Sequence, residues 1–148
     1  MMKLSVDRVN RYEDKIHFIV EDMRLFEEWF PQDVKEFITD VKTRKAIYKI
    51  IQEVVDCIMD LVAMMLRDEG LPVHDDYTNI SKLRDIRILE DDLYSQLREL
   101  NGLRNVIVHK YNGVDDDDEL AYESISELKD AIYSFLKVVR TWLKKKES

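Results

Sequence analysis

Apolar residues recur along most of this chain at steps of three or four, the spacing of one face of an α-helix. The first run predicts a helix over Asp7–Phe30, which ends at Pro31 because proline disfavours helical geometry in the residue before it. The second run predicts one long helix, roughly Asp33–Glu69, whose length leaves room for a bend. Gly70 suits the left-handed conformation that closes such a helix.

The remaining runs predict three more helices. A short one spans about residues 81–89, with Ser81 or Asn79 accepting hydrogen bonds at its start. Another spans about 93–111, and a final helix, with the most regular apolar pattern, spans about 119–145. No segment alternates between apolar and polar residues as a strand does. The pattern therefore predicts an all-α antiparallel bundle of four or five helices in a single domain covering all 148 residues.

Charge and composition narrow the possible functions. The net charge of -8 argues against nonspecific nucleic-acid binding, because phosphates repel an acidic surface, but it allows a locally basic site. Cys57 is the only cysteine and lies in an apolar helical pattern, so we expect a buried thiol and a reducing environment. No apolar segment has the length of a signal peptide or a membrane span, so we expect a soluble, cytoplasmic protein.

Two charge clusters have alternative interpretations. The run Asp115–Asp118 offers carboxylates for magnesium or calcium, but it lacks the glycine and spaced ligands of a calcium loop. Its position favours the solvated start of the final helix. Lys144–Lys146 is interpreted as a solvated, frayed terminus rather than a phosphate contact. His17 and His74 have no second ligand at zinc spacing, and no glycine-rich phosphate loop occurs, so we expect neither a metal nor a cofactor.

The helix at about 93–111 is unusual because polar residues are set into its apolar pattern. Asp91 or Asp92 is placed to cap its start, and Gly113 to end it. Gly102, Asn105 and His109 share one line along it. The adjacent line, at steps of four and three, contains Leu93, Leu97, Leu100, Arg104, Ile107 and Tyr111.

Gly102, Arg104 and His109 are each unusual at their positions in this helix. A glycine inside a helix costs ~1 kcal/mol relative to alanine, so Gly102 suggests close approach by another helix or a ligand. Arg104 lies in an apolar seam, where an unpaired guanidinium is expensive. His109 lies in the last turn, and an imidazole ordinarily exchanges its proton near neutral pH. The alternative is structural: Arg104 pairs with an acid across the bundle, His109 caps the helix and Tyr111 packs.

The segment RNVIVHKY, Arg104 to Tyr111, resembles the R-x4-H-x-Y signature of HEPN-superfamily ribonucleases, with Asn105 as the first variable residue. The wider layout is similar to the HepT-like branch: a long second helix, the loop LPVHDDY, a short helix, the motif helix and a final amphipathic helix. The resemblance implies metal-independent RNA cleavage that leaves a cyclic phosphate. His109 would act as the acid–base catalyst, Arg104 would stabilise the transition state, and Asn105 would position the phosphate or the histidine.

The resemblance also implies partners. The family builds its site in a cleft between two protomers, which agrees with Gly102 as a position of close contact. Related toxins are paired with an MntA-like nucleotidyltransferase antitoxin that silences them by adding AMP to the tyrosine matching Tyr111. A locally positive cleft is compatible with the acidic chain, since basic residues gather near the motif: Arg98, Arg104 and Lys110, with Arg84 and Arg87 before them.

Three hypotheses therefore follow from the sequence. The first is a ribonuclease toxin that acts through Arg104 and His109. The second is a non-catalytic HEPN-like module that binds a nucleotidyltransferase partner or a nucleotide. The third is a helical dimer without chemistry, in which replacing His109 has no consequence.

Overall fold

The computed structural model describes residues 3–111 and 117–147, and for Lys110 and Tyr111 it describes the backbone but not the side chain. Gly113 and the first half of the acidic run therefore lie outside the described residues. The described ranges contain helices and no strand, which confirms the all-α class. None of these helices combines the length and the apolar character that crossing a membrane requires. The helices are α1 (Val6–Trp29), α2 (Val34–Thr39), α3 (Val41–Asp68), α4 (Asp76–Asp85), α5 (Asp91–Tyr111) and α6 (Asp118–Glu147).

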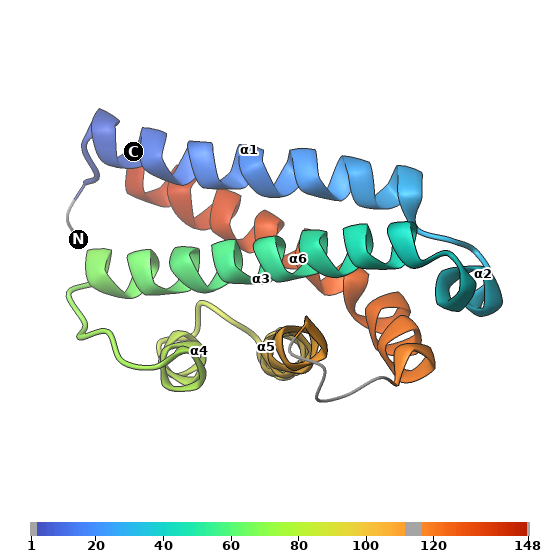
Figure 1. The fold of residues 1–148 in the computed structure, drawn as a ribbon. Coiled ribbons are helices and arrows are strands. Elements are labelled where there is room, and N and C mark those ends of the chain that lie inside the picture. Colours follow the sequence, from blue (N-terminus) through green and yellow to red (C-terminus); the bar gives the residue numbers. More distant parts are fainter. Residues whose placement is uncertain (1–2, 112–116, 148) are drawn as a thin grey trace.

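The helix α3 occupies the centre of the structure and packs against α1, α2, α4 and α5. Figure 1 shows α1 and α3 running side by side in opposite directions, while α4 and α5, seen end-on, cross beneath them. The helix α6 closes the core by packing against α1, α2 and α5. The outer helices α1 and α6 contribute one apolar face to the interior, as their pattern predicted, whereas α3 is buried on several faces. This arrangement places the second half of α5 against the middle of α3.

The single helix predicted over residues 33–69 is in fact two helices, divided at Asp40. The Asp40 carboxylate accepts hydrogen bonds from the backbone N–H of Thr43 at 3.1 Å and from the Thr43 hydroxyl at 2.8 Å. These bonds lower the pKa of Asp40 and start α3 afresh. Thr39 bonds back to the carbonyl of Lys35 at 2.9 Å and ends α2. At the far end, Gly70 has the predicted left-handed conformation, with φ of 79°.

The short helix begins earlier than predicted, because neither Ser81 nor Asn79 caps it. Asp75 caps α4 by accepting from the backbone N–H of Thr78 at 2.9 Å. The Asn79 side chain is buried and instead closes the preceding loop, accepting from the His74 N–H at 2.8 Å and donating to the His74 carbonyl at 3.1 Å. The motif helix also starts early, so Asp91 lies in its first turn rather than before it.

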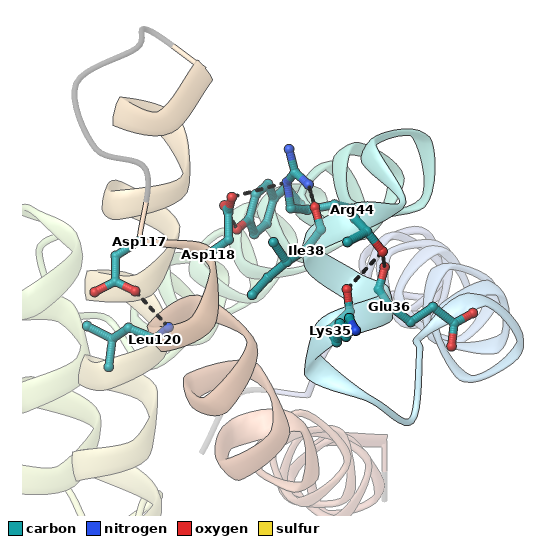
Figure 2. A network of polar contacts seen from close by, with 9 residues as sticks. Lys35, Glu36, Ile38, Arg44, Asp117, Asp118 and Leu120 are labelled. Atoms are coloured by element: carbon teal, nitrogen blue, oxygen red, sulfur yellow. Dashed lines mark hydrogen bonds and ion pairs between the residues drawn. The ribbon is translucent and has the colours of Figure 1, made fainter.

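Asp117 and Asp118, the described part of the acidic run, stabilise the start of α6. Asp117 accepts from the backbone N–H of Leu120 at 3.0 Å, which confirms the predicted helix start. Asp118 is paired rather than merely solvated, since Arg44 lies 3.4 Å from it. Figure 2 shows Arg44 between Asp118 and the carbonyl of Ile38, which joins α2, α3 and α6 at one point.

The predicted frayed C-terminus is wrong for Lys146. The side chain of Lys146 is buried, and its Nζ lies 2.8 Å from Glu69 and 5.4 Å from the centre of the Trp142 ring. Its carbonyl also accepts from the backbone N–H of Leu4 at 3.2 Å. A lysine can be buried in this way because its aliphatic stem packs while its charge is paired. The helix therefore stays ordered to Glu147.

Candidate active site

Arg104 lies partly exposed in the apolar seam of α5, and it is paired across the bundle. Its Nε donates to a carboxylate oxygen of Asp56 on α3 at 2.7 Å, with 31% of the Arg104 side chain and 44% of the Asp56 side chain exposed. Its Nη1 donates to the side-chain oxygen of Asn105 at 3.1 Å. The residues on either side of it in the seam, Leu100 and Ile107, are fully buried. The pairing expected under the structural alternative is therefore present, and it fixes the guanidinium at the surface.

Acidic side chains of α3 and of the first turn of α4 surround Arg104. Burial raises the pKa of Asp76, the positive charge of Arg104 opposes that rise, and the negative charges of Asp56 and Asp60 reinforce it. Asp60 is itself paired with Lys15 at 3.2 Å. The carboxylates near the guanidinium thus outnumber the cations.

A hollow of about 430 Å³ opens beside Asp56, between α1 and α3. We call its lining the acidic face: Asp14, Lys15, Phe18, Glu53, Asp56, Cys57 and Asp60. Four carboxylates and one lysine make this hollow unfavourable for a phosphate group. Within the described ranges, no group of three or more histidine, cysteine or acidic side chains is placed to hold a metal ion.

Cys57 is a structural residue of this face, as its sequence position predicted. It is 7% exposed, and its thiol lies 3.5 Å from the carbonyl of Lys15. Burial raises the pKa of the thiol to about 11, and nearby carboxylates add to the effect. A thiol with such a pKa is not a nucleophile at neutral pH.

His109 is exposed in the last turn of α5. It follows Arg104 by five residues, which corresponds to about 7.5 Å along the helix axis and about 140° around it. Among the described side chains, Arg104 and Asn105 are joined directly, while no hydrogen bond links Arg104 to His109. Tyr111 ends α5, and its side chain lies outside the described residues. Within one protomer, Arg104 and His109 therefore lie on the same half of α5 without contacting each other.

Contacts among the described residues do not require a glycine at position 102. A Cβ atom added to Gly102 would lie 3.7 Å from the hydroxyl of Tyr77 on α4, an ordinary van der Waals distance. The helix therefore accepts the unfavourable propensity of glycine without a reason in the part of the chain that the structure describes. Close approach by a second protomer or a ligand stays a prediction.

The sequence indicated Arg84 and Arg98 as basic residues near the motif, but not the tyrosines that pack against them. We call Tyr77, Arg84, Tyr94 and Arg98 the arginine–tyrosine ridge. The Arg84 guanidinium carbon lies 4.0 Å from the centre of the Tyr94 ring, and that of Arg98 lies 4.9 Å from the Tyr77 ring and 5.6 Å from the Tyr94 ring. The spacing of four between Tyr94 and Arg98 was visible in the sequence, but their packing against α4 was not.

The family model and the relatives that match this chain are all named as ribonucleases. The family model described as "Ribonuclease HepT-like" matches residues 19–139, which include the whole motif. A protein of Archaeoglobus fulgidus named "Putative RNase" is 35% identical over 140 residues, covering 95% of this chain and 98% of the relative. A Methanocaldococcus jannaschii protein, also named as an RNase, is 45% identical over 75 residues, covering 50% of this chain and 86% of its own length.

Solved structures with the same fold include toxins bound to antitoxins. The tri-AMPylated Shewanella oneidensis HEPN toxin in complex with MNT antitoxin has a TM-score of 0.77 at 16% identity, covering 93% of this chain and 99% of that one. A toxin–antitoxin MntA–HpeT structure has a TM-score of 0.76 at 17% identity, covering 86% and 96%. At these identities the likeness shows a shared fold.

Proposed function

Because this chain belongs to the ribonuclease HepT-like family, and is therefore a ribonuclease, we propose that it cuts RNA with Arg104 and His109 and without a metal ion. We further propose that it is the toxin of a toxin–antitoxin pair. The observation that carries the site assignment is the Arg104 guanidinium, which Asp56 and Asn105 hold at the surface one and a half turns before an exposed His109.

The reaction is a transesterification within the RNA. The 2′-hydroxyl oxygen attacks the adjacent phosphorus, the bond from phosphorus to the 5′-oxygen breaks, and a 2′,3′-cyclic phosphate is left. His109 accepts the proton of the 2′-hydroxyl, and the departing 5′-oxygen takes a proton from water, so no oxidant or metal is needed. Arg104 donates to the phosphate oxygens, which gain negative charge in the transition state.

Asn105 and Asp56 are positioning residues in this proposal. Asn105 accepts from Arg104 at 3.1 Å, so it orients the guanidinium toward the phosphate. Asp56 occupies Nε at 2.7 Å and leaves other N–H donors of the fork for substrate. A guanidinium held from two sides loses little conformational entropy when the phosphate binds.

We propose that the working enzyme is a homodimer whose cleft contains two copies of the motif. Arg104 and His109 point from different lines of α5, so a second protomer would supply groups that one chain leaves apart. The absence of any crowding at Gly102 in the described part of the chain supports this, because a partner helix is a sufficient reason for a glycine there. An exposed Val106, with 38% of its surface accessible, lies on the same half of α5.

We propose that a nucleotidyltransferase antitoxin of the MntA type controls this site by adding AMP to Tyr111. Tyr111 is two residues beyond His109, at the end of the same helix. A nucleotide attached there would bring a phosphate beside Arg104 and His109. It would occupy the position that the RNA phosphate needs.

The test is RNA cleavage in the presence of EDTA by the wild type, His109→Ala and Arg104→Ala. His17→Ala on α1 and Arg24→Ala on the same helix are matched controls, since both side chains are exposed and distant in sequence from the motif. We expect the two motif variants to lose roughly 10²- to 10⁴-fold in rate, while the controls keep it. Equal activity in all five proteins would refute the proposal, and RNA or nucleotide binding without turnover would favour a non-catalytic module.

A further inference from the structure

The arginine–tyrosine ridge continues the line of the motif toward the start of α5. Tyr94, Arg98, Gly102, Asn105 and His109 follow one another at steps of four, four, three and four, so they share one face of the helix. From Arg98 to His109 this face extends about 16 Å along the axis. The α4 residues Tyr77 and Arg84 widen it on one side.

We propose that the ridge binds the single-stranded RNA on one side of the scissile phosphate, an inference that rests on the proposed function. The RNA phosphates contact Arg84 and Arg98, and the rings of Tyr77 and Tyr94 hold these two guanidinium groups in place. A row of cations in fixed positions follows the backbone of single-stranded nucleic acid whatever its sequence.

The stacked arrangement suits phosphate binding in particular. A guanidinium that lies over a ring still has N–H donors along its edge, and these match two phosphate oxygens at once. Arg98 lies between two rings, 4.9 Å and 5.6 Å from their centres, so its position is fixed before substrate arrives. Fixing the side chain in advance reduces the entropy lost on binding.

The electrostatic surroundings of Tyr94 agree with a positive ridge. The pKa of Tyr94 is lowered, first because its phenol oxygen contacts the Ser81 hydroxyl and then because the charges of Arg98 and Arg84 favour the phenolate. On the other side of Arg104, the acidic face repels a phosphate. Arg84 is also paired with Asp85 at 3.6 Å, an exposed ion pair that solvent screens. An RNA strand that reaches the motif is therefore favoured along the ridge and disfavoured along the acidic face.

The probe for the experiment is a fluorescent RNA oligonucleotide carrying 2′-O-methyl groups throughout, which removes the attacking hydroxyl and leaves the phosphates. Fluorescence anisotropy gives its Kd at several salt concentrations. Arg98→Ala is expected to weaken binding roughly tenfold and to reduce the salt slope by about one. Tyr94→Leu is expected to weaken binding roughly fivefold with an unchanged salt slope, because it removes the ring that positions Arg84 and Arg98 but no charge.

Two control variants test whether a loss of RNA binding is specific to the ridge. Tyr94→Phe keeps the ring and should bind as the wild type does, and Arg24→Ala removes an exposed arginine from α1 and should do the same. In cleavage assays with unmodified RNA, the ridge variants should raise KM with kcat little changed. Circular dichroism establishes that each variant is folded before its affinity is compared.

The outcomes distinguish this inference from the proposed function. Unchanged Kd and KM for both Arg98→Ala and Tyr94→Leu, in a wild type that cuts RNA, would overturn the ridge alone. If light scattering showed that these variants dimerise more weakly than the wild type, and the fraction that is dimeric bound RNA with the wild-type Kd, the ridge would be a protein interface instead. A wild type that binds the probe but never cuts unmodified RNA would overturn the proposed function and leave the ridge. Failure of the wild type to bind the probe would overturn both.

Discussion

The two sides of Arg104 differ in almost every chemical respect. On the α1–α3 side lies the acidic face, with four carboxylates and one lysine around a hollow. On the α4–α5 side lies the ridge, where two arginines stack on two tyrosines. The net charge of -8 describes neither side, so it is a poor guide to what this surface binds.

The contrast assigns different tasks to the two sides. Asp56 belongs to the acidic face and pairs with Arg104 from the α3 side, while the ridge extends the line that contains the half-buried Asn105 and the exposed His109. Asp56 accepts from Nε of Arg104, and Asn105, on the line that the ridge continues, accepts from Nη1. In our account the acidic face positions the catalytic arginine, and the ridge receives the substrate.

The largest effect should come from reversing one charge on each side. We expect Arg98→Glu to lower kcat/KM for RNA cleavage by roughly a hundredfold, because it removes a phosphate contact and adds repulsion. Asp60→Lys on the acidic face, whose native side chain is 61% exposed, should change kcat/KM by less than about threefold. Equal losses from both reversals would mean that the two sides do not differ in their role.

A smaller effect is expected when the Asp56–Arg104 pair is broken on the acid side. Asp56→Asn keeps the shape of the side chain but removes its charge, so Arg104 is held less firmly, and kcat should fall about tenfold with KM nearly unchanged. Stability should change by less than about 1 kcal/mol, because both partners are partly exposed. Steady-state kinetics measures kcat and KM, and thermal unfolding measures the change in stability. A higher kcat for Asp56→Asn would contradict the prediction, because it would show that Asp56 restrains Arg104.

The next prediction concerns Gly102, which lies on the ridge side of α5. Since an added Cβ meets only the Tyr77 hydroxyl at 3.7 Å, Gly102→Ala should stabilise the protomer by up to about 1 kcal/mol. If a second protomer approaches this position, the same variant should weaken the dimer and the cleavage rate. Thermal unfolding and light scattering test the two statements separately, and a stabilised, fully active dimer would remove the case for close approach at Gly102.

The smallest effect is a pH dependence on the acidic side, where Asp22 of α1 faces Glu53 of α3. Burial raises the pKa of Asp22 from 3.8 to about 6, and the hydrogen bond and charge of Glu53 add to it. The folded protein therefore holds this proton more tightly than the unfolded chain does, so stability falls as pH rises from about 4 to about 6. Asp22→Asn should flatten this part of the Tm profile and raise Tm slightly at pH 7; an unaltered profile would contradict the assignment.

Much of the fold follows from short-range patterns in the sequence. The apolar steps of α1 and α6 predicted both helices to within a few residues, and the seam of α5 predicted that Arg104 needs a partner. Local capping was harder to foresee. Asp40 and Asp75 each start a helix through a following threonine, and such carboxylates look the same in a helix interior as at its boundary.

The parts that escaped prediction depend on contacts between distant segments. Asp56 is 48 residues from Arg104 in the sequence, so no spacing rule identifies it as the partner. Arg84 stacks on Tyr94 only because α4 packs on α5. Lys146 is buried because Glu69, the residue after α3, pairs with it and Trp142 of α6 packs against it. These contacts are set by packing of whole helices, which a single sequence does not specify.

The most direct test of the central claim is the chemistry of the cut ends. Mass spectrometry of RNA cleaved by the wild type in EDTA should show 2′,3′-cyclic phosphate on one product and a 5′-hydroxyl on the other, with both absent for His109→Ala. A single 2′-deoxy substitution at the cleaved nucleotide should block the cut. Products bearing 5′-phosphate, or cleavage that needs a divalent metal ion, would contradict the account.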